Sequence, residues 1–127
     1  MDNHDCIFCK IANNLIPSKV IYEDEYVKVI MDVNPVVDGH ALVIPKKHYT
    51  DFLSLDLEIR NHIMNVANDL APKFMEKLGS TGITLLVNYG DTQKVKHFHL
   101  HLLPDYCKKT VDHLKRSIDE NYAILKD

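Results

Sequence analysis

The sequence predicts an α+β fold: a mostly antiparallel five-stranded sheet with one long central helix and a C-terminal helix. Two observations predict it. Short β-rich runs gather in two groups along the chain, and a long stretch with helical periodicity separates the groups. Strands clustered in series with helices between the groups are typical of antiparallel α+β sheets. The chain of 127 residues has the length of one domain, which we expect to span 1–127.

The first half of the chain predicts a short helix and three strands. A helical turn is expected at 7–12, and Pro17 breaks the chain after it. The segment KVIYEDEYVKVIMD then predicts a hairpin of strands 19–22 and 27–31 around an acidic turn. The run HALVIP at 40–45 is predicted as the next strand, because it follows the turn-forming pair Asp38-Gly39 and stops at Pro45.

The long helix is predicted over 55–78. Apolar residues recur there at steps of three or four, the spacing of one helix face, at Ile59, Ile63, Val66, Leu70, Phe74 and Leu78. Gly79 is a typical helix terminator. Pro72 lies inside the pattern, and we expect it to kink or split the helix because it lacks a backbone N–H.

The last part of the chain predicts two strands and a second helix. The strands are ITLLVN at 83–88 and HFHLHLL at 97–103. The amphipathic helix is indicated by Val111, Leu114, Ile118, Tyr122 and Leu125, with Thr110 as its N-cap.

The overall composition is that of an ordinary globular protein and excludes two classes of partner. The formal net charge is −3, so no basic surface is expected for nucleic acid, whose binding depends on Lys and Arg neutralising phosphates. The N-terminus resembles no secretory signal, and no apolar run approaches the roughly 20 residues of a membrane span. We therefore expect a cytoplasmic protein that binds neither nucleic acid nor membrane.

The segment HFHLHLL places three histidines at alternate positions. In a strand, alternate side chains share one face, so His97, His99 and His101 would point one way and the apolar residues between them the other. A neutral imidazole can attack an electrophile such as phosphorus through one ring nitrogen if the other donates its proton to a fixed acceptor. A metal site and a chance surface cluster are the alternatives, and catalysis is the interpretation we favour.

Two of the three cysteines form a CxxC pair, Cys6 and Cys9. In a chain kept reduced, such a pair indicates metal binding rather than a disulfide framework. A structural zinc ion needs four ligands, so two more must come from elsewhere in the sequence. A redox-active pair and two inert buried thiols are the alternatives.

The motifs together resemble the HIT (histidine triad) superfamily. HFHLHLL matches its histidine signature, and CIFCKI, IPSKVIYEDE, DGHALVIPKKH and LLVN occur in the family's order, so that the resemblance covers about residues 5 to 106. The sequence is most similar to the histidine triad nucleotide-binding branch, and especially to its zinc-containing bacterial members. This resemblance implies a nucleotide hydrolase or nucleoside phosphoramidase that works through a nucleotidyl-histidine intermediate.

The resemblance also implies roles for four catalytic histidines. His99 corresponds to the nucleophile, His101 to a partner that contacts phosphate and leaving group, and His97 to the first histidine of the triad. His40 corresponds to a fourth histidine, which supports the triad from a neighbouring strand. Because the transferase branch replaces the third histidine with glutamine, the presence of His101 favours water as the final acceptor.

The resemblance implies a nucleotide pocket as well. Asp32 corresponds to the aspartate that accepts hydrogen bonds from the ribose hydroxyls, a task suited to a carboxylate. Asn88 corresponds to a polar contact near phosphate or ribose. Family positions that line the base pocket are occupied by residues that are otherwise ordinary core candidates: Ile7, Phe8, Ile11, Ile30, Met31 and Val33.

The loop between the last two strands departs from the family pattern. The family has a glycine-rich loop ending in glycine-glutamine-serine or threonine, whereas this chain has the shorter NYGDTQKVKH. Gln93 is retained, and we expect it to bind the nucleotide. Lys94 occupies the hydroxyl position, where it adds a charge-assisted phosphate contact or points to solvent.

Zinc and a second copy of the chain are the remaining implied partners. Zinc-containing family members have ligands at positions that correspond to Cys6, Cys9, His48 and His97, which predicts a structural zinc ion that takes no part in the chemistry. The region of the long helix and its adjoining strand corresponds to the family's dimer interface and predicts a homodimer.

We therefore expect hydrolysis at the α-phosphorus of purine nucleoside phosphoramidates or AMP esters. The alternatives are a non-catalytic nucleotide-binding module with a regulatory or interaction role, a dinucleoside polyphosphate hydrolase, and a zinc or redox protein in which all histidines are structural.

Overall fold

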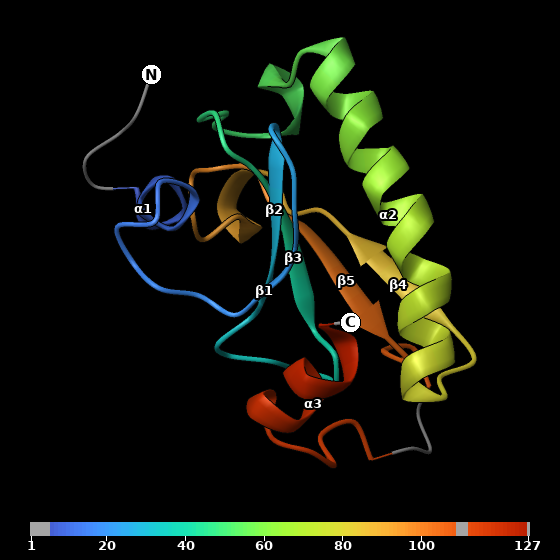
Figure 1. Cartoon of the computed structure of the whole chain (residues 1–127). Helices are drawn as coiled ribbons and strands as arrows, with labels where there is room; N and C mark the ends of the chain where they lie inside the picture. Colours follow the sequence, from blue (N-terminus) through green and yellow to red (C-terminus); the bar gives the residue numbers. More distant parts are fainter. Residues whose placement is uncertain (1–5, 109–111, 127) are drawn as a thin grey trace.

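The computed structural model describes residues 6–108 and 112–126 and has the predicted α+β architecture (Figure 1). Its five strands form one antiparallel sheet in the order β1-β2-β3-β5-β4. The strands are β1 (Val20–Glu23), β2 (Val27–Met31), β3 (Ala41–Pro45), β4 (Ile83–Leu86) and β5 (Leu100–Pro104). The hairpin, the third strand and both later strands were predicted from sequence to within a few residues.

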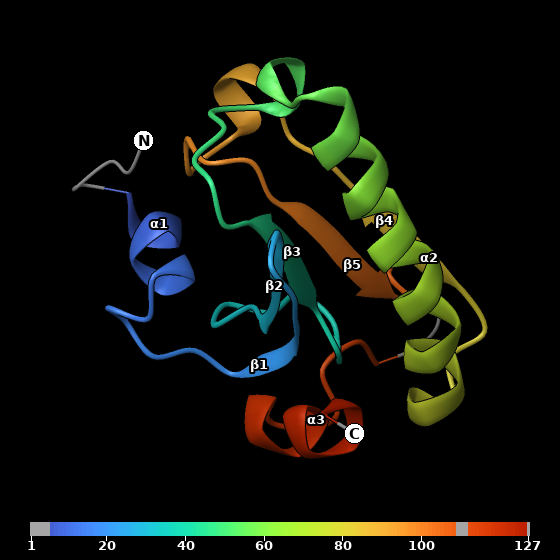
Figure 2. The same cartoon turned by 45° about the horizontal axis from the view of Figure 1, so that its top comes forward.

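The two faces of the sheet are covered by different helices. Val29 of β2 and Val43 of β3 face the long helix α2 (Leu57–Leu78) and belong to the main core. Leu42 and Ile44 point the other way and pack against the short helix α1 (Ile7–Ala12), as alternation along a strand requires. Figure 2 shows α1 and α2 on opposite sides of the sheet.

Helix α2 runs unbroken through Pro72, so the prediction that this proline could split the helix was wrong. Pro72 lies on the exposed side of the helix, where water can hydrate the carbonyl group that loses its N–H partner. The predicted helix face is confirmed, because Ile63, Val66 and Phe74 are buried against the sheet. Gly79 ends the helix in a left-handed conformation with φ of 69°.

In the part of the chain that the structure describes, no helix is both long and apolar enough to cross a membrane. Helix α2 has the length, with 22 residues, but its outer face carries charged side chains.

Strand β5 begins at Leu100, so the prediction of a strand from residue 97 was wrong for its first three residues. The register that pairs Val43 with Leu100 would bring Pro45 opposite Phe98, and proline has no N–H to donate to a ladder. The N–H of Phe98 donates instead to the carbonyl of Tyr49 at 2.6 Å. The backbone of 97–99 therefore leaves the sheet, although the alternation of apolar and histidine side chains continues through it.

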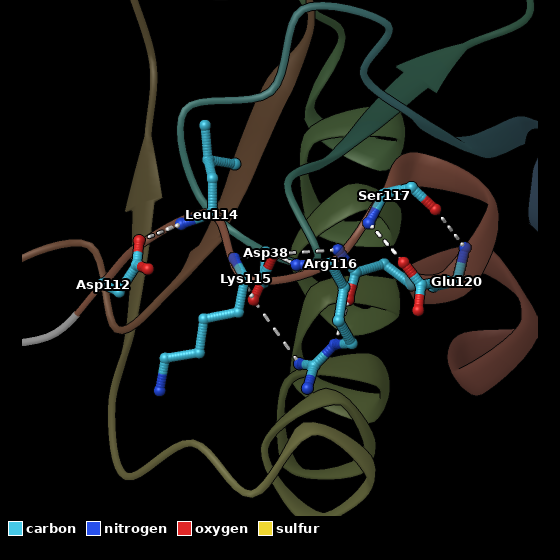
Figure 3. Close-up of polar contacts among 8 residues, drawn as sticks. Asp38, Asp112, Leu114, Lys115, Arg116, Ser117 and Glu120 are labelled. Carbon is cyan, nitrogen blue, oxygen red and sulfur yellow. Dashed lines mark hydrogen bonds and ion pairs between the residues drawn. The ribbon is translucent and has the colours of Figure 1, made fainter.

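The C-terminal helix α3 spans Ile118–Leu125 and begins later than predicted. Ser117 and Glu120 form a capping box that starts it, so Leu114 lies outside the helix; the predicted N-cap Thr110 and Val111 lie outside the described residues. Figure 3 shows why the chain before Ser117 is not helical. Asp38 accepts hydrogen bonds from the N–H groups of Lys115 and Arg116, which holds this segment to the loop before β3.

Candidate active site and metal centre

A cavity of about 580 Å³ lies on the α1 side of the sheet. Its walls come from α1, the loop 16–18, the end of β2, the loop 88–95 and the start of β5. Nine of the residues predicted to bind nucleotide line it: Ile7, Phe8, Ile11, Ile30, Met31, Asp32, Val33, Asn88 and Lys94. The volume suits a single nucleotide, because ligand pockets typically measure roughly 300–1,000 Å³.

The sequence interpretation missed several lining residues. These are Ile16, Pro17, Ser18, Asn34, Leu42, Thr92 and Val95. Asn34, Thr92 and Val95 are each adjacent to a predicted residue, and Ile16, Pro17 and Ser18 belong to the motif IPSKVIYEDE. Leu42 lies on β3 opposite His101, a position that could have been inferred from strand pairing. Pocket residues beside or within a motif can therefore be predicted from the sequence. A pocket residue on a neighbouring strand can be predicted only when the register of the strand pairing is known.

Gln93 is not among the residues that line the cavity, contrary to the expectation from its motif. Its side chain is buried, and its amide nitrogen donates to the carbonyl oxygens of Thr50 at 2.7 Å and Val95 at 3.0 Å. An amide with both N–H groups bonded to backbone has a scaffolding function. Gln93 therefore fixes the loop that borders the cavity.

His99 is half-buried and has its ring oriented by the backbone. Its Nδ1 lies 2.9 Å from the carbonyl oxygen of His97, and only a protonated Nδ1 can donate to that acceptor. The ring also contacts the edge or face of Phe8, with centroids 4.9 Å apart. With the proton on Nδ1, the Nε2 atom of neutral His99 carries a free lone pair.

His101 and His40 have the opposite arrangement. The N–H of Val36 donates to Nδ1 of His40, so the His40 proton lies on Nε2, which is 2.9 Å from Nδ1 of His101. His101 thus accepts at Nδ1 and carries its own proton on Nε2. That atom is buried and has no partner among the described residues, which makes it a donor available to a bound molecule.

The histidines of the cavity are uncharged near neutral pH. Burial lowers the pKa of His101 to about 4, helped by the neighbouring rings of His99 and His40 and opposed by the charge of Asp32. Burial also lowers the pKa of His40 and of His99. The cavity therefore presents one bare imidazole nitrogen and one imidazole N–H side by side, with ring centroids 5.0 Å apart.

Asp32 lies at the end of β2 and faces the same cavity. Its Oδ1 accepts the N–H of Asn34 at 2.8 Å, and its Oδ2 lies 3.2 Å from Nε2 of His40. A carboxylate has about four acceptor positions, so lone pairs of Asp32 are left for hydroxyl groups of a ligand. Asp32, His40 and His101 also lie close enough to hold a metal ion, but the hydrogen bonds already account for their spacing.

The imidazole of His97 lies outside the cavity. Its side chain is fully buried beside α1, where it meets Cys6, Cys9 and His48, the other three predicted metal ligands. The three histidines of the triad therefore divide between two centres, and His97 contributes to the cavity through the carbonyl oxygen that holds His99.

The four ligand atoms of this cluster have the spacing of a tetrahedral zinc site. Nδ1 of His97 lies 3.2 Å from Sγ of Cys6, 3.3 Å from Sγ of Cys9 and 3.2 Å from Nδ1 of His48. Zinc bond lengths predict roughly 3.3–3.6 Å between ligand atoms at tetrahedral angles. The donor set of two thiolates and two imidazoles is also a common one for structural zinc.

The surroundings of the cluster orient its ligands. Nε2 of His97 donates to the carbonyl oxygen of Pro45 at 2.8 Å, so its Nδ1 presents a lone pair to the centre of the cluster. Burial lowers the pKa of His97 to about 4, which keeps that lone pair free of a proton. The N–H of Cys9 donates to Sγ of Cys6 at 3.2 Å, the type of bond that stabilises a thiolate.

An antiparallel α+β fold with a pair of histidines beside a cavity of nucleotide size is typical of one class of small proteins. A match to a family model identifies that class. The HIT domain model matches residues 13–108, most of the chain. The chain therefore belongs to the HIT, or histidine triad, family.

Three known proteins illustrate the similarity. An uncharacterized HIT-like protein from Methanocaldococcus jannaschii is 45% identical over 80% of this chain and 79% of its own length. A zinc-bound histidine triad family protein from Mycobacterium smegmatis has a TM-score of 0.86 and 32% identity, covering 96% of this chain and 91% of that one. The adenylylsulfatase HINT3 of Arabidopsis thaliana is 33% identical over 80% of this chain but only 52% of its own length.

Proposed function

We propose that this protein is a nucleotide hydrolase that cleaves at the α-phosphorus of purine nucleoside phosphoramidates or AMP esters. The observation that carries the proposal is the pair of opposite tautomers in the cavity: a free Nε2 lone pair on His99 beside a free Nε2–H on His101. A nucleophile adjacent to a donor for phosphate oxygens is the arrangement that nucleophilic catalysis at phosphorus needs. Membership of a family that includes an adenylylsulfatase supports an adenylyl substrate.

In the first step, Nε2 of His99 attacks the α-phosphorus and forms a P–N bond. The bond from phosphorus to the leaving group breaks, the leaving group takes the electron pair, and a leaving amine or alcohol also takes one proton from solvent, which the second step returns. The N–H of His101 donates to a phosphate oxygen, and His40 holds His101 in the tautomer that can do so. The carbonyl oxygen of His97 stabilises the positive charge that develops on His99, because it accepts the Nδ1 proton.

In the second step, water attacks the phosphorus of the nucleotidyl-histidine. The P–N bond breaks, its electron pair returns to Nε2 of His99, and the proton released by water passes to solvent. The products are the nucleoside monophosphate and the regenerated imidazole. Water can reach the intermediate because several residues that line the cavity, among them Val33, Thr92 and Lys94, are exposed to solvent.

The nucleotide would be held by groups at the α1 end of the cavity. Asp32 accepts hydrogen bonds from the two ribose hydroxyls, and the apolar side chains of Phe8, Ile11 and Ile30 pack against the flat base. The base therefore contributes binding energy, and the hydroxyls fix the orientation.

We further propose that zinc occupies the site formed by Cys6, Cys9, His48 and His97. A bound ion supplies a structural crosslink between α1 and the segment that precedes β5. It would hold the wall of the base pocket and the carbonyl group of His97 in place, so its effect on the reaction is indirect.

The edge of the sheet offers a surface for a second copy of the chain, and we propose a homodimer formed there. The groove of about 330 Å³ beside α2 is lined by apolar residues that include Met64, Val87 and Leu100. Exposed Leu85 lies nearby on the edge strand β4, whose outer side has unpaired backbone groups. Pairing of two such surfaces would bury both.

The test is to quench the reaction with adenosine 5′-phosphoramidate and to analyse the protein by mass spectrometry. An added AMP on the peptide that contains His99 is the expected result. The His99→Ala variant should lose at least about 10³-fold in kcat, whereas His62→Ala, which removes an imidazole bonded to Asp24 far from the cavity, should retain turnover. Absence of both adduct and hydrolysis, with nucleotide still bound, would favour a non-catalytic nucleotide-binding module.

A further inference from the structure

The cavity is electrically asymmetric. Of the described residues that line it, two carry a full charge, Asp32 at the end of β2 and Lys94 on the loop 88–95. The histidines add no positive charge near neutral pH, because burial lowers the pKa of both His101 and His40. A bound molecule therefore contacts one permanently charged cation, the ammonium group of Lys94 on the loop 88–95.

The backbone that carries Lys94 is fixed on both sides. Buried Gln93 is bonded through its amide to Thr50 and Val95, and Val95 packs against the apolar cluster beneath α1. The base of the Lys94 side chain is thus anchored, although its outer part is exposed. A charged group on a fixed base can bind a ligand at a smaller entropy cost than one on a mobile loop.

The Lys94 ammonium is also available for binding. Among the described residues it has no hydrogen bond or ion pair, unlike the neighbouring Lys96, whose ammonium donates to the carbonyl oxygen of Gly90 at 2.9 Å. The hydroxyl of Thr92 on the same loop donates to the carbonyl oxygen of Tyr89 at 3.0 Å. Of the side chains on this loop that line the cavity, Asn88 and Lys94 therefore have donors to offer, and of these two Lys94 carries the charge.

The loop that carries Lys94 borders the same cavity as the nucleophile. His99 lies immediately before β5 and lines the cavity together with Lys94, and in-line displacement expels the leaving group on the side of the phosphorus opposite to Nε2 of His99. The exposed rim of the cavity includes Thr92 and Lys94. A leaving group that accumulates negative charge there gains a charge-assisted contact, and a neutral amine does not.

We propose that Lys94 selects anionic leaving groups, so that the preferred substrates are mixed anhydrides of AMP with an inorganic acid such as sulfate or phosphate. The P–O bond to the acid breaks, and its electron pair leaves as the negative charge of the released anion, which needs no proton from the site. This inference rests on the proposed function and narrows its substrate class.

The experiment compares two substrates that share AMP and differ in leaving group: adenosine 5′-phosphosulfate, which releases sulfate, and adenosine 5′-phosphoramidate, which releases ammonia. The readout is the ratio of their kcat/KM values. Lys94→Gln should lower the ratio of phosphosulfate to phosphoramidate by about tenfold or more, the value of one charged hydrogen bond. Lys94→Arg should keep the ratio within about threefold, because it retains the charge.

Lys96→Gln is the matched control, because it removes the same charge from the same loop but from a side chain that does not line the cavity. It should leave the ratio unchanged. The wild-type ratio should also fall as salt screens the exposed ammonium, and this dependence should disappear in Lys94→Gln. An equal ratio in wild type and Lys94→Gln would overturn the proposal while the proposed function stands, whereas failure of the wild type to hydrolyse either substrate would overturn both.

Discussion

Replacement of Gly39 by alanine tests how the histidines of the cavity are held in place. Gly39 lies between Asp38, which anchors the segment before α3, and His40, which orients His101. Its φ is +80°, and an added Cβ would lie 2.5 Å from Cδ1 of Leu78 and 3.3 Å from Cγ of Pro104. Both the backbone conformation and the space therefore require glycine.

The two costs can be estimated separately. A left-handed conformation costs a residue with a Cβ roughly 1–2 kcal/mol. Overpacking costs roughly 1–3 kcal/mol, and the lower half of that range applies because partly buried Leu78 can shift. We expect Gly39→Ala to lower the free energy of unfolding by about 3 kcal/mol. With an unfolding entropy of about 2.1 cal/mol/K per residue, this lowers Tm by about 11 °C for the chain of 127 residues.

Two other glycines provide matched controls in urea unfolding. Gly79 has φ of +69° with nothing within 4 Å of an added Cβ, so Gly79→Ala should show only the backbone cost, about 1–2 kcal/mol. Gly82 has neither a positive φ nor a close neighbour, and Gly82→Ala should change stability by about 0.5 kcal/mol or less. If Gly39→Ala costs no more than Gly79→Ala, the contact with Leu78 is absent in solution and the reasoning is refuted.

Three further predictions concern the histidines of the cavity, the proposed zinc site and the proposed dimer surface. The pKa of His101 is lowered to about 4 in the folded state, so the unfolded state binds more protons below about pH 6.5; stability should fall by about 2 kcal/mol between pH 6.5 and 4, and His101→Gln should reduce this loss. Cys9→Ser should abolish the binding of one zinc ion per chain measured by elemental analysis, and stabilisation by excess zinc, about 4 kcal/mol at a thousandfold over Kd, should disappear. Met64→Glu, at a residue 51% exposed beside the apolar groove, should convert the dimer to monomer in analytical ultracentrifugation.

Each of these three predictions has an outcome that would contradict it. An acid loss unchanged in His101→Gln would assign that loss to other groups. Zinc bound at full stoichiometry by Cys9→Ser would place the metal elsewhere. A wild-type monomer, or a Met64→Glu dimer of undiminished affinity, would remove the groove as an interface. Leu114→Glu, at an exposed apolar residue that does not line the groove, is the control for an added charge.

Local patterns were sufficient for most of the elements. The helical spacing from Ile59 to Leu78 identified α2 and its buried face, because a helix repeats every 3.6 residues whatever packs against it. The stop at Gly79 and the hairpin of β1 and β2 also depend on residues close together in the chain. The family motifs added the positions of the histidines and of most pocket residues.

The two strand and helix starts that were predicted too early share a cause. Strand β5 starts later than predicted because Pro45, more than 50 residues earlier, has no backbone N–H to donate to it. The segment before β5 instead bonds to Pro45 through the His97 side chain, which donates to the Pro45 carbonyl oxygen. Helix α3 starts late because the Asp38 side chain holds the N–H groups of Lys115 and Arg116, 77 and 78 residues away. Periodicity has no information about such partners, so both segments seemed to continue their local pattern.

The sequence by itself determined which side chains are candidates for the proposed chemistry, since it contains three alternate imidazoles and a CxxC pair. Only the tertiary structure decided how they are divided: His97 turns to the cysteines, while His99 and His101 take opposite tautomers in the cavity. Those tautomers are set by the carbonyl group of His97 and by a chain of bonds through His40, which lies 61 residues before His101. The position of a proton on an imidazole depends on the acceptor or donor that packing brings to the ring, and no local pattern specifies it.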